Sequence, residues 1–121
     1  MSVVLAPRVL VVDDEPSVRL VTRLMLERAG HAAEEAGDAA DAVARLTAGP
    51  PPAVVVLDVT LPDCAGTDLI PELRRLVPGV RIVLTSGLLE EAVFGHGADI
   101  YLPKPFTKEQ LLAAVRAVLG V

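Results

Sequence analysis

Five polar side chains stand where apolar segments of the chain end: Asp13, Asp14, Asp58, Ser86 and Lys104. Three carboxylates in one crevice would repel one another unless positive charge lay among them. Oxygen ligands select a hard cation, and Mg²⁺ fits because it takes one or two carboxylates together with phosphate oxygens. A carboxylate beside a divalent ion and a lysine can attack phosphorus and form an aspartyl phosphate. These residue types therefore predict phosphoryl transfer, in which Mg²⁺, Lys104 and the Ser86 hydroxyl each meet one equatorial oxygen.

Each of these residues, taken alone, also has a purely structural interpretation. Asp13 and Asp14 precede a proline and are compatible with a helix cap. Asp58 and Ser86 are compatible with turns, and Lys104 with a surface position. Their joint placement after four different strands favours a site.

The elements that position these residues are predicted from hydrophobic patterning. Continuous apolar runs and their flanks predict five strands: Arg8–Val12, His31–Ala36, Ala53–Leu57, Val80–Leu84 and Asp99–Leu102. Of these, the segment AVVVL over 53–57 has the clearest strand pattern, since it is wholly apolar and mostly β-branched.

Helices are predicted between and after these strands. The first is capped by Asp14 or Glu15 and ends at Gly30, the second begins after Asp38, and a short one of at most three turns lies within 88–97. The third covers Leu69–Leu76, and the last follows a Thr107 cap. Two apolar stripes at helical spacing are expected to face the core: Val18, Val21, Leu24, Met25 and Ala29 in the first helix, and Leu111, Leu112, Val115 and Val118 in the last.

Regular alternation of strand and helix predicts an α/β fold with one doubly wound, five-stranded parallel sheet. At 121 residues the chain forms one domain, residues 1–121. Ligands of such sheets bind beyond the carboxyl ends of the strands, near the point where strand order reverses. The five polar residues are therefore expected at that edge.

Composition narrows the class of protein further. The net charge of −5 argues against direct nucleic-acid binding, and no apolar run approaches the length of a membrane helix. The single cysteine, Cys64, cannot form an internal disulfide, which fits a reducing compartment. The apolar start has no basic region and leads into Asp13, so it is interpreted as a strand rather than a signal peptide. A cytoplasmic location is expected.

Four segments together resemble the signatures of response-regulator receiver domains of two-component signalling. They are VLVVDDEP, VVVLDVTLPDCAG, IVLTSG and ADIYLPKPF, in this order and after the expected strands. The resemblance covers essentially the whole chain. It implies a flavodoxin-like (βα)5 fold with strand order 2-1-3-4-5, and a switch that catalyses only its own phosphorylation and dephosphorylation.

The resemblance also implies roles for single residues. Asp58 resembles the phospho-acceptor and a metal ligand, and Asp14 the direct ligand of Mg²⁺. Asp13 resembles a ligand that acts through water, and the main-chain carbonyl of Thr60 is expected to complete the protein's share of the coordination.

Lys104, Ser86 and Tyr101 resemble the residues that sense the phosphoryl group. Lys104 is expected to bind phosphate, and its bond to the following proline is often cis in the family. Ser86 resembles the switch hydroxyl, with the adjacent Thr85 as the alternative, because the small Gly87 follows Ser86. Tyr101 resembles the aromatic residue whose rotamer reports activation, although a half-buried structural role is also open.

The expected partners are a histidine kinase or phosphotransfer protein as donor, and a downstream protein or a covalently linked kinase or output domain. The segment between Ser86 and Lys104 is shorter than in many receivers, as in receivers attached to sensor kinases, and the apolar Leu88 is expected to slow dephosphorylation. Two other functions stay open. A haloacid-dehalogenase-type phosphohydrolase would need a second Asp at Thr60, and a flavin-binding fold would need a phosphate loop in place of DDEP.

Overall fold

The structure is a computed structural model that describes residues 7–87 and 97–120. The short helix and the Leu88 position considered above therefore lie outside the described residues. In chain order the elements are β1 (Arg8–Val12), α1 (Pro16–Arg28), β2 (Ala32–Ala36), α2 (Ala39–Thr47), β3 (Val54–Asp58), α3 (Gly66–Leu76), β4 (Arg81–Ser86), β5 (Ile100–Pro103) and α4 (Lys108–Leu119).

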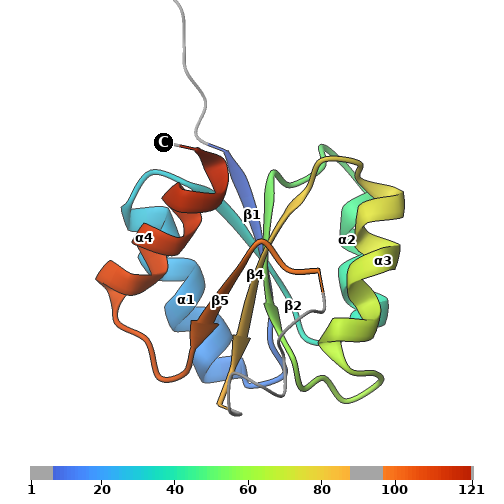
Figure 1. The fold of residues 1–121 in the computed structure, drawn as a ribbon, viewed down its shortest axis with the longest axis horizontal. Helices are drawn as coiled ribbons and strands as arrows, with labels where there is room; N and C mark the ends of the chain where they lie inside the picture. Colours follow the sequence, from blue (N-terminus) through green and yellow to red (C-terminus); the bar gives the residue numbers. More distant parts are fainter. Residues whose placement is uncertain (1–6, 88–96, 121) are drawn as a thin grey trace, which may run out of the picture.

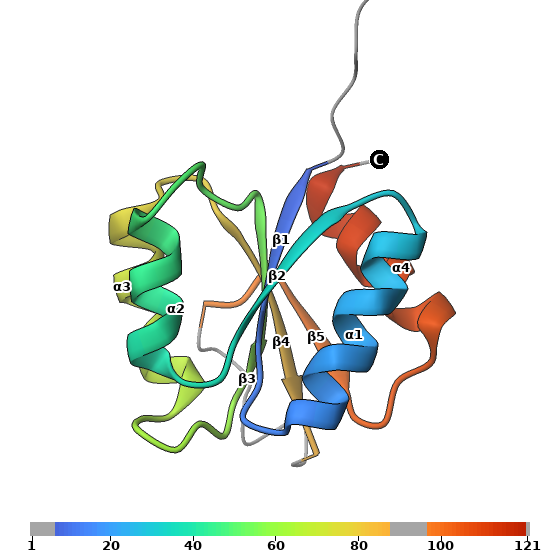
Figure 2. The same cartoon turned by 180° about the vertical axis from the view of Figure 1, so that it is seen from behind.

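The five strands form one parallel sheet in the order β2-β1-β3-β4-β5, so the predicted fold class and strand order are confirmed. Helices α1 and α4 cover one face of the sheet, and α2 and α3 cover the other (Figures 1 and 2). Strand β2 is added on one side of β1, and β3, β4 and β5 are added on the other side. The order of strands in the sheet therefore reverses between β1 and β3, which are direct neighbours. The loops that follow these two strands meet at the lower edge of the sheet in Figure 1.

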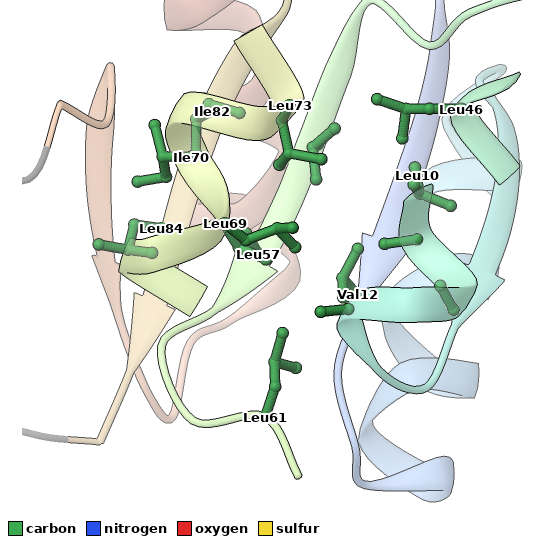
Figure 3. Close-up of a cluster of buried hydrophobic side chains, with 14 of the residues drawn as sticks. Leu10, Val12, Leu46, Leu57, Leu61, Leu69, Ile70, Leu73, Ile82 and Leu84 are labelled. Carbon is green, nitrogen blue, oxygen red and sulfur yellow. The ribbon is translucent and has the colours of Figure 1, made fainter. Parts of the chain in front are cut away.

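The core has two layers because each central strand is buried on both faces. Residues of β3 alternate between them: Val55 and Leu57 pack towards α2 and α3, whereas Val54 and Val56 pack towards α1 and α4. Figure 3 shows the first layer, in which side chains from the sheet meet those of the two helices. This packing fixes the strand ends, and with them the loops that carry the polar residues.

Several element boundaries differ from the prediction. Strand β3 ends at Asp58 and β4 runs through Ser86, because the polar residues continue the ladder with their neighbours. The Val59 amide donates to the carbonyl of Thr85 at 2.9 Å, for example. Strand β2 begins at residue 32 rather than 31, β5 covers residues 100–103 rather than 99–102, and α3 begins at Gly66, three residues before the predicted start.

The predicted apolar face of α1 is partly wrong. Val21, Leu24 and Ala29 are exposed, whereas Thr22 and Leu26 are buried. The helix is turned so that Arg19 and Arg23 both reach Glu35 of β2. The cost of burying the Thr22 hydroxyl is avoided because it donates to a main-chain carbonyl one turn earlier.

The predicted caps of α2 and α4 and the final helix are confirmed. Asp38 caps α2 by accepting a hydrogen bond from the Asp41 amide, and Thr107 forms a capping box with Gln110. The predicted stripe of α4 packs against the core. Glu15 occupies the N-cap position of α1, but its side chain forms no cap hydrogen bond there. Within the described residues, no helix is long and apolar enough to cross a membrane.

Candidate functional site

Three carboxylates converge where β1 and β3 end. One oxygen from each of Asp13, Asp14 and Asp58 lies within 4.8 Å of the others. Asp13 and Asp58 are buried, with 4% and 6% of their surfaces exposed, whereas Asp14 is exposed. The convergence expected from the sequence is therefore confirmed for all three residues.

Lys104 supplies the positive charge that this cluster needs. Its Nζ donates to Oδ2 of Asp13 at 2.7 Å and to Oδ2 of Asp58 at 3.1 Å. Burial alone would lower the pKa of Lys104, but the hydrogen bond to Asp13 and the charge of Asp58 raise it, so the ammonium form persists. The lysine follows β5, which β4 separates from β3, and its long side chain spans that distance. The Lys104–Pro105 bond is cis, as expected.

Asp58 is the carboxylate with the most unusual environment. Burial raises its pKa, while the Thr60 amide and the charge of Lys104 act in the opposite direction. The Thr60 N–H donates to Oδ1 of Asp58 at 3.2 Å, so the two oxygens of the acid have different partners. Because burial disfavours the charged carboxylate, a cation beside Asp58 would stabilise that form.

The loop that carries Thr60 folds tightly over Asp58. Thr60 and Ala65 form an isolated bridge, and the Gly66 amide donates to the Val59 carbonyl at 2.6 Å. A side chain at Gly66 would meet the Asp58 carbonyl oxygen at 2.0 Å, so this close approach requires glycine. This glycine is the last residue of the segment VVVLDVTLPDCAG, but the residue type alone does not reveal the contact.

The two candidate hydroxyls, Thr85 and Ser86, are both buried at 2% exposure. The Thr85 hydroxyl donates to the main-chain carbonyl of Leu57 at 3.4 Å. Ser86 shares its face of β4 with Leu84, since side chains alternate along a strand, and Tyr101 packs against the same layer. The Tyr101 hydroxyl donates to the Ser86 carbonyl at 3.2 Å. The structure thus brings Tyr101 to Ser86.

Asp63 has a structural role that the sequence did not reveal. Its carboxylate accepts the amides of Ala39 and Ala40 at 2.9 and 3.0 Å, and these bonds lower its pKa. The loop after β3 is thereby tied to the N-terminus of α2, where an acid is favoured by the helix dipole. An Asp in a loop gives no sequence signal for so remote a partner.

The donor set of the cluster consists of carboxylate oxygens from Asp13, Asp14 and Asp58. Such a set fits a hard divalent cation and does not fit a soft one. The half-exposed cysteine, Cys64, does not change this, because burial raises the pKa of its thiol.

Comparison with known families gives the same result as the geometry. Residues 9–116 match the model of the response regulator receiver domain. The chain belongs to this family. The receiver is 38% identical over 115 residues to the probable transcriptional regulatory protein TcrX of Mycobacterium tuberculosis, covering 92% of this chain and 49% of that protein. It is 40% identical over 116 residues to the response regulator MprA of a Mycobacterium species, covering 93% and 50%.

Solved structures of receivers superpose closely. A CheY-like receiver domain protein from Methanospirillum hungatei gives a TM-score of 0.86 at 31% identity, covering 95% of this chain and 94% of that one. A response regulator from Burkholderia pseudomallei, solved with a phosphorylated aspartic acid and a calcium ion, gives 0.81 at 31% identity, covering 89% and 65%.

Family membership decides between the functions that the sequence left open. The receiver is a phosphorylation-dependent switch with an acidic pocket formed by Asp13, Asp14 and Asp58, and it is not a conventional enzyme. The phosphohydrolase and flavin-binding alternatives are therefore set aside. The chain spans about half the length of the curated relatives cited above.

Proposed function

We propose that this receiver takes a phosphoryl group on Asp58 in a Mg²⁺-dependent reaction, and that the modification changes a surface read by another protein. The observation that carries the proposal is the burial of Asp58 between two acids and one amine. Lys104 lies 3.1 Å from Asp58, and the Asp13 and Asp14 oxygens lie within 4.8 Å of it and of each other.

The chain's own groups divide the work of transfer between them. A carboxylate oxygen of Asp58 forms the new bond to phosphorus, while the bond from phosphorus to the donor breaks and the donor leaves with that electron pair. The Thr60 amide orients the acid through Oδ1. Lys104, already held by Asp13 and Asp58, neutralises an equatorial oxygen.

Asp14, Asp58 and the Thr60 carbonyl would hold the metal directly, and Asp13 through water. When bound, Mg²⁺ supplies positive charge that offsets the repulsion between the acids and the incoming phosphoryl oxygens. Burial raises the pKa of Asp58 and so disfavours its anionic form. The positive charge of the metal would stabilise that anion and reduce the repulsion among the three carboxylates.

Ser86 and Tyr101 are the proposed switch. The Ser86 hydroxyl meets the phosphoryl group, and Tyr101 follows it inward. The present bond from the Tyr101 hydroxyl to the Ser86 carbonyl links the tyrosine to the backbone that must move. Thr85 is the neighbouring alternative, and its hydroxyl donates to the Leu57 carbonyl at 3.4 Å.

Receivers partner with histidine kinases, and we propose a cytoplasmic kinase or phosphotransfer protein as donor here. Such a donor must approach beside Asp58. Helix α1 exposes Leu20, Val21 and Leu24 by 42, 48 and 38%, and a largely apolar groove of about 500 Å³ runs from Val21 to Lys104. Exposed apolar side chains next to the site suit a protein donor. A downstream protein, or an output domain in the same polypeptide, is proposed to bind the changed surface and pass the signal on.

Incubation of the chain with acetyl phosphate and Mg²⁺, followed by intact-mass spectrometry, tests the proposal. One phosphoryl group, stable to acid and labile to base, is expected on the wild type. It should be lost in Asp58→Asn, kept in the exposed control Asp68→Asn, and formed more slowly in Lys104→Met. Phosphorylation of Asp58→Asn, or no effect of chelating Mg²⁺, would refute the assignment.

A further inference from the structure

The amide, the carbonyl and the carboxylate of Asp13 all form hydrogen bonds. Its amide donates to the Ala36 carbonyl at 3.1 Å, and its carboxylate accepts the Glu15 amide at 2.9 Å and the Lys104 amine at 2.7 Å. Its carbonyl accepts Nη1 of Arg19 at 2.8 Å. This last bond comes from the first turn of α1, from a residue to which the proposed reaction assigns no role.

Arg19 is itself held from the edge of the sheet. Its Nε donates to Oε1 of Glu35 on β2 at 2.9 Å, and the two side chains are only 20% and 25% exposed. Burial alone would raise the pKa of Glu35, but hydrogen bonds from Arg23 and Arg19 lower it, so Glu35 stays a carboxylate. Gly37 leaves room for the guanidinium, since a Cβ there would lie 3.2 Å from Nη1.

The guanidinium therefore bridges β2 and the acidic loop. Because the peptide between Asp13 and Asp14 is planar, fixing the Asp13 carbonyl also fixes the amide and Cα of Asp14. The direction of the exposed Asp14 carboxylate depends on that placement. Arginine suits this task, since its planar fork donates to two partners in fixed directions.

We propose that Arg19, oriented by Glu35, is a positioning residue for the metal-binding loop, and that it sets the affinity of the site for Mg²⁺. The inference rests on the proposed function, because it presupposes that Asp13 and Asp14 contribute to a metal site. It adds a residue outside the acidic cluster whose loss weakens metal binding.

The charge of Arg19 and its geometry predict opposite effects. A cation close to the acidic cluster repels Mg²⁺, so removing its charge alone would tighten binding. Removing the hydrogen bond to the Asp13 carbonyl frees the loop and weakens binding. The direction of the change in Kd therefore separates the two roles.

The Kd of Mg²⁺ for the full chain, measured by isothermal titration calorimetry without any phosphodonor, provides the test. Arg19→Gln should weaken binding about tenfold, the lower end of what outer partners of metal ligands contribute. Arg23→Gln is the matched control, because it removes the same charge and another bond to Glu35. It should stay within about twofold, since the hydrogen bonds of Arg23 go to Glu35 and Glu27. Arg19→Lys keeps the charge and should fall between the wild type and Arg19→Gln.

Unchanged or tighter binding by Arg19→Gln would overturn the inference, as would equal weakening in Arg23→Gln. Should Arg19→Gln not fold, Arg19→Lys and Gly37→Ala decide, because both disturb the guanidinium and keep its charge. Wild-type affinity in both of these would overturn the inference. A wild-type chain that binds no Mg²⁺ would instead refute the proposed metal site, and the role of Arg19 with it.

Discussion

Replacing Gly66 with alanine perturbs the loop over Asp58 without touching a polar side chain. A Cβ at Gly66 would lie 2.0 Å from the Asp58 carbonyl oxygen and 3.1 Å from the Val59 Cα. Since close carbon–oxygen contacts are about 3.3 Å, the two backbones must separate by roughly 1.3 Å. That movement breaks the 2.6 Å hydrogen bond from the Gly66 amide to the Val59 carbonyl. The lost bond and the overpacking together should lower the free energy of unfolding by roughly 2–4 kcal/mol.

The strand cannot yield easily, because all five residues of β3 are buried and the Val59 amide is bonded to β4. Urea unfolding followed by far-UV circular dichroism measures the change, since the chain has no tryptophan. Gly49→Ala is the matched control: a Cβ there meets nothing within 4 Å. Its effect should stay within about 0.5 kcal/mol. A loss below about 1 kcal/mol in Gly66→Ala would refute the reasoning, because it would mean that the loop and the strand end are not rigidly held.

Two further predictions concern the site and its surroundings. Without Mg²⁺, Asp58→Asn should unfold at a higher urea concentration than the wild type at pH 7.5 and lose that advantage towards pH 4. Because burial raises the folded-state pKa of Asp58, its contribution to stability falls as pH rises from the ordinary carboxyl value, about 4, to the raised one. Saturating Mg²⁺ should stabilise the wild type more than the variant; an advantage for Asn that grows as pH falls would contradict this. On α1, Val21→Glu should slow phosphoryl transfer from the histidine kinase donor about tenfold and leave the rate with acetyl phosphate unchanged, since Val21 is 48% exposed and lines the groove beside Lys104. Equal slowing with both donors would place the effect in the site rather than in docking.

Most of the fold was predictable from apolar patterning. Strand β3 is formed mostly by a run of apolar, β-branched residues. The alternation of strands and helices leaves few alternatives to a parallel sheet. The face of α1 was not predictable. Thr22 and Leu26 are buried in place of Val21 and Leu24, because the helix is oriented partly by the ion pairs of its arginines with Glu35, and helical spacing alone does not reveal such partners.

By itself the sequence determined which acids would meet. Asp13 and Asp58 end apolar runs, and the carboxyl ends of parallel strands lie at one edge, so the two acids converge whatever the details of the loops. Only the tertiary structure decided that Lys104 bonds both of them and that Gly66 contacts the Asp58 backbone. The two lysine bonds join segments far apart in the chain, and the close approach of Gly66 depends on how tightly the loop after β3 turns. They depend on strand register and loop conformation, which local periodicity does not encode.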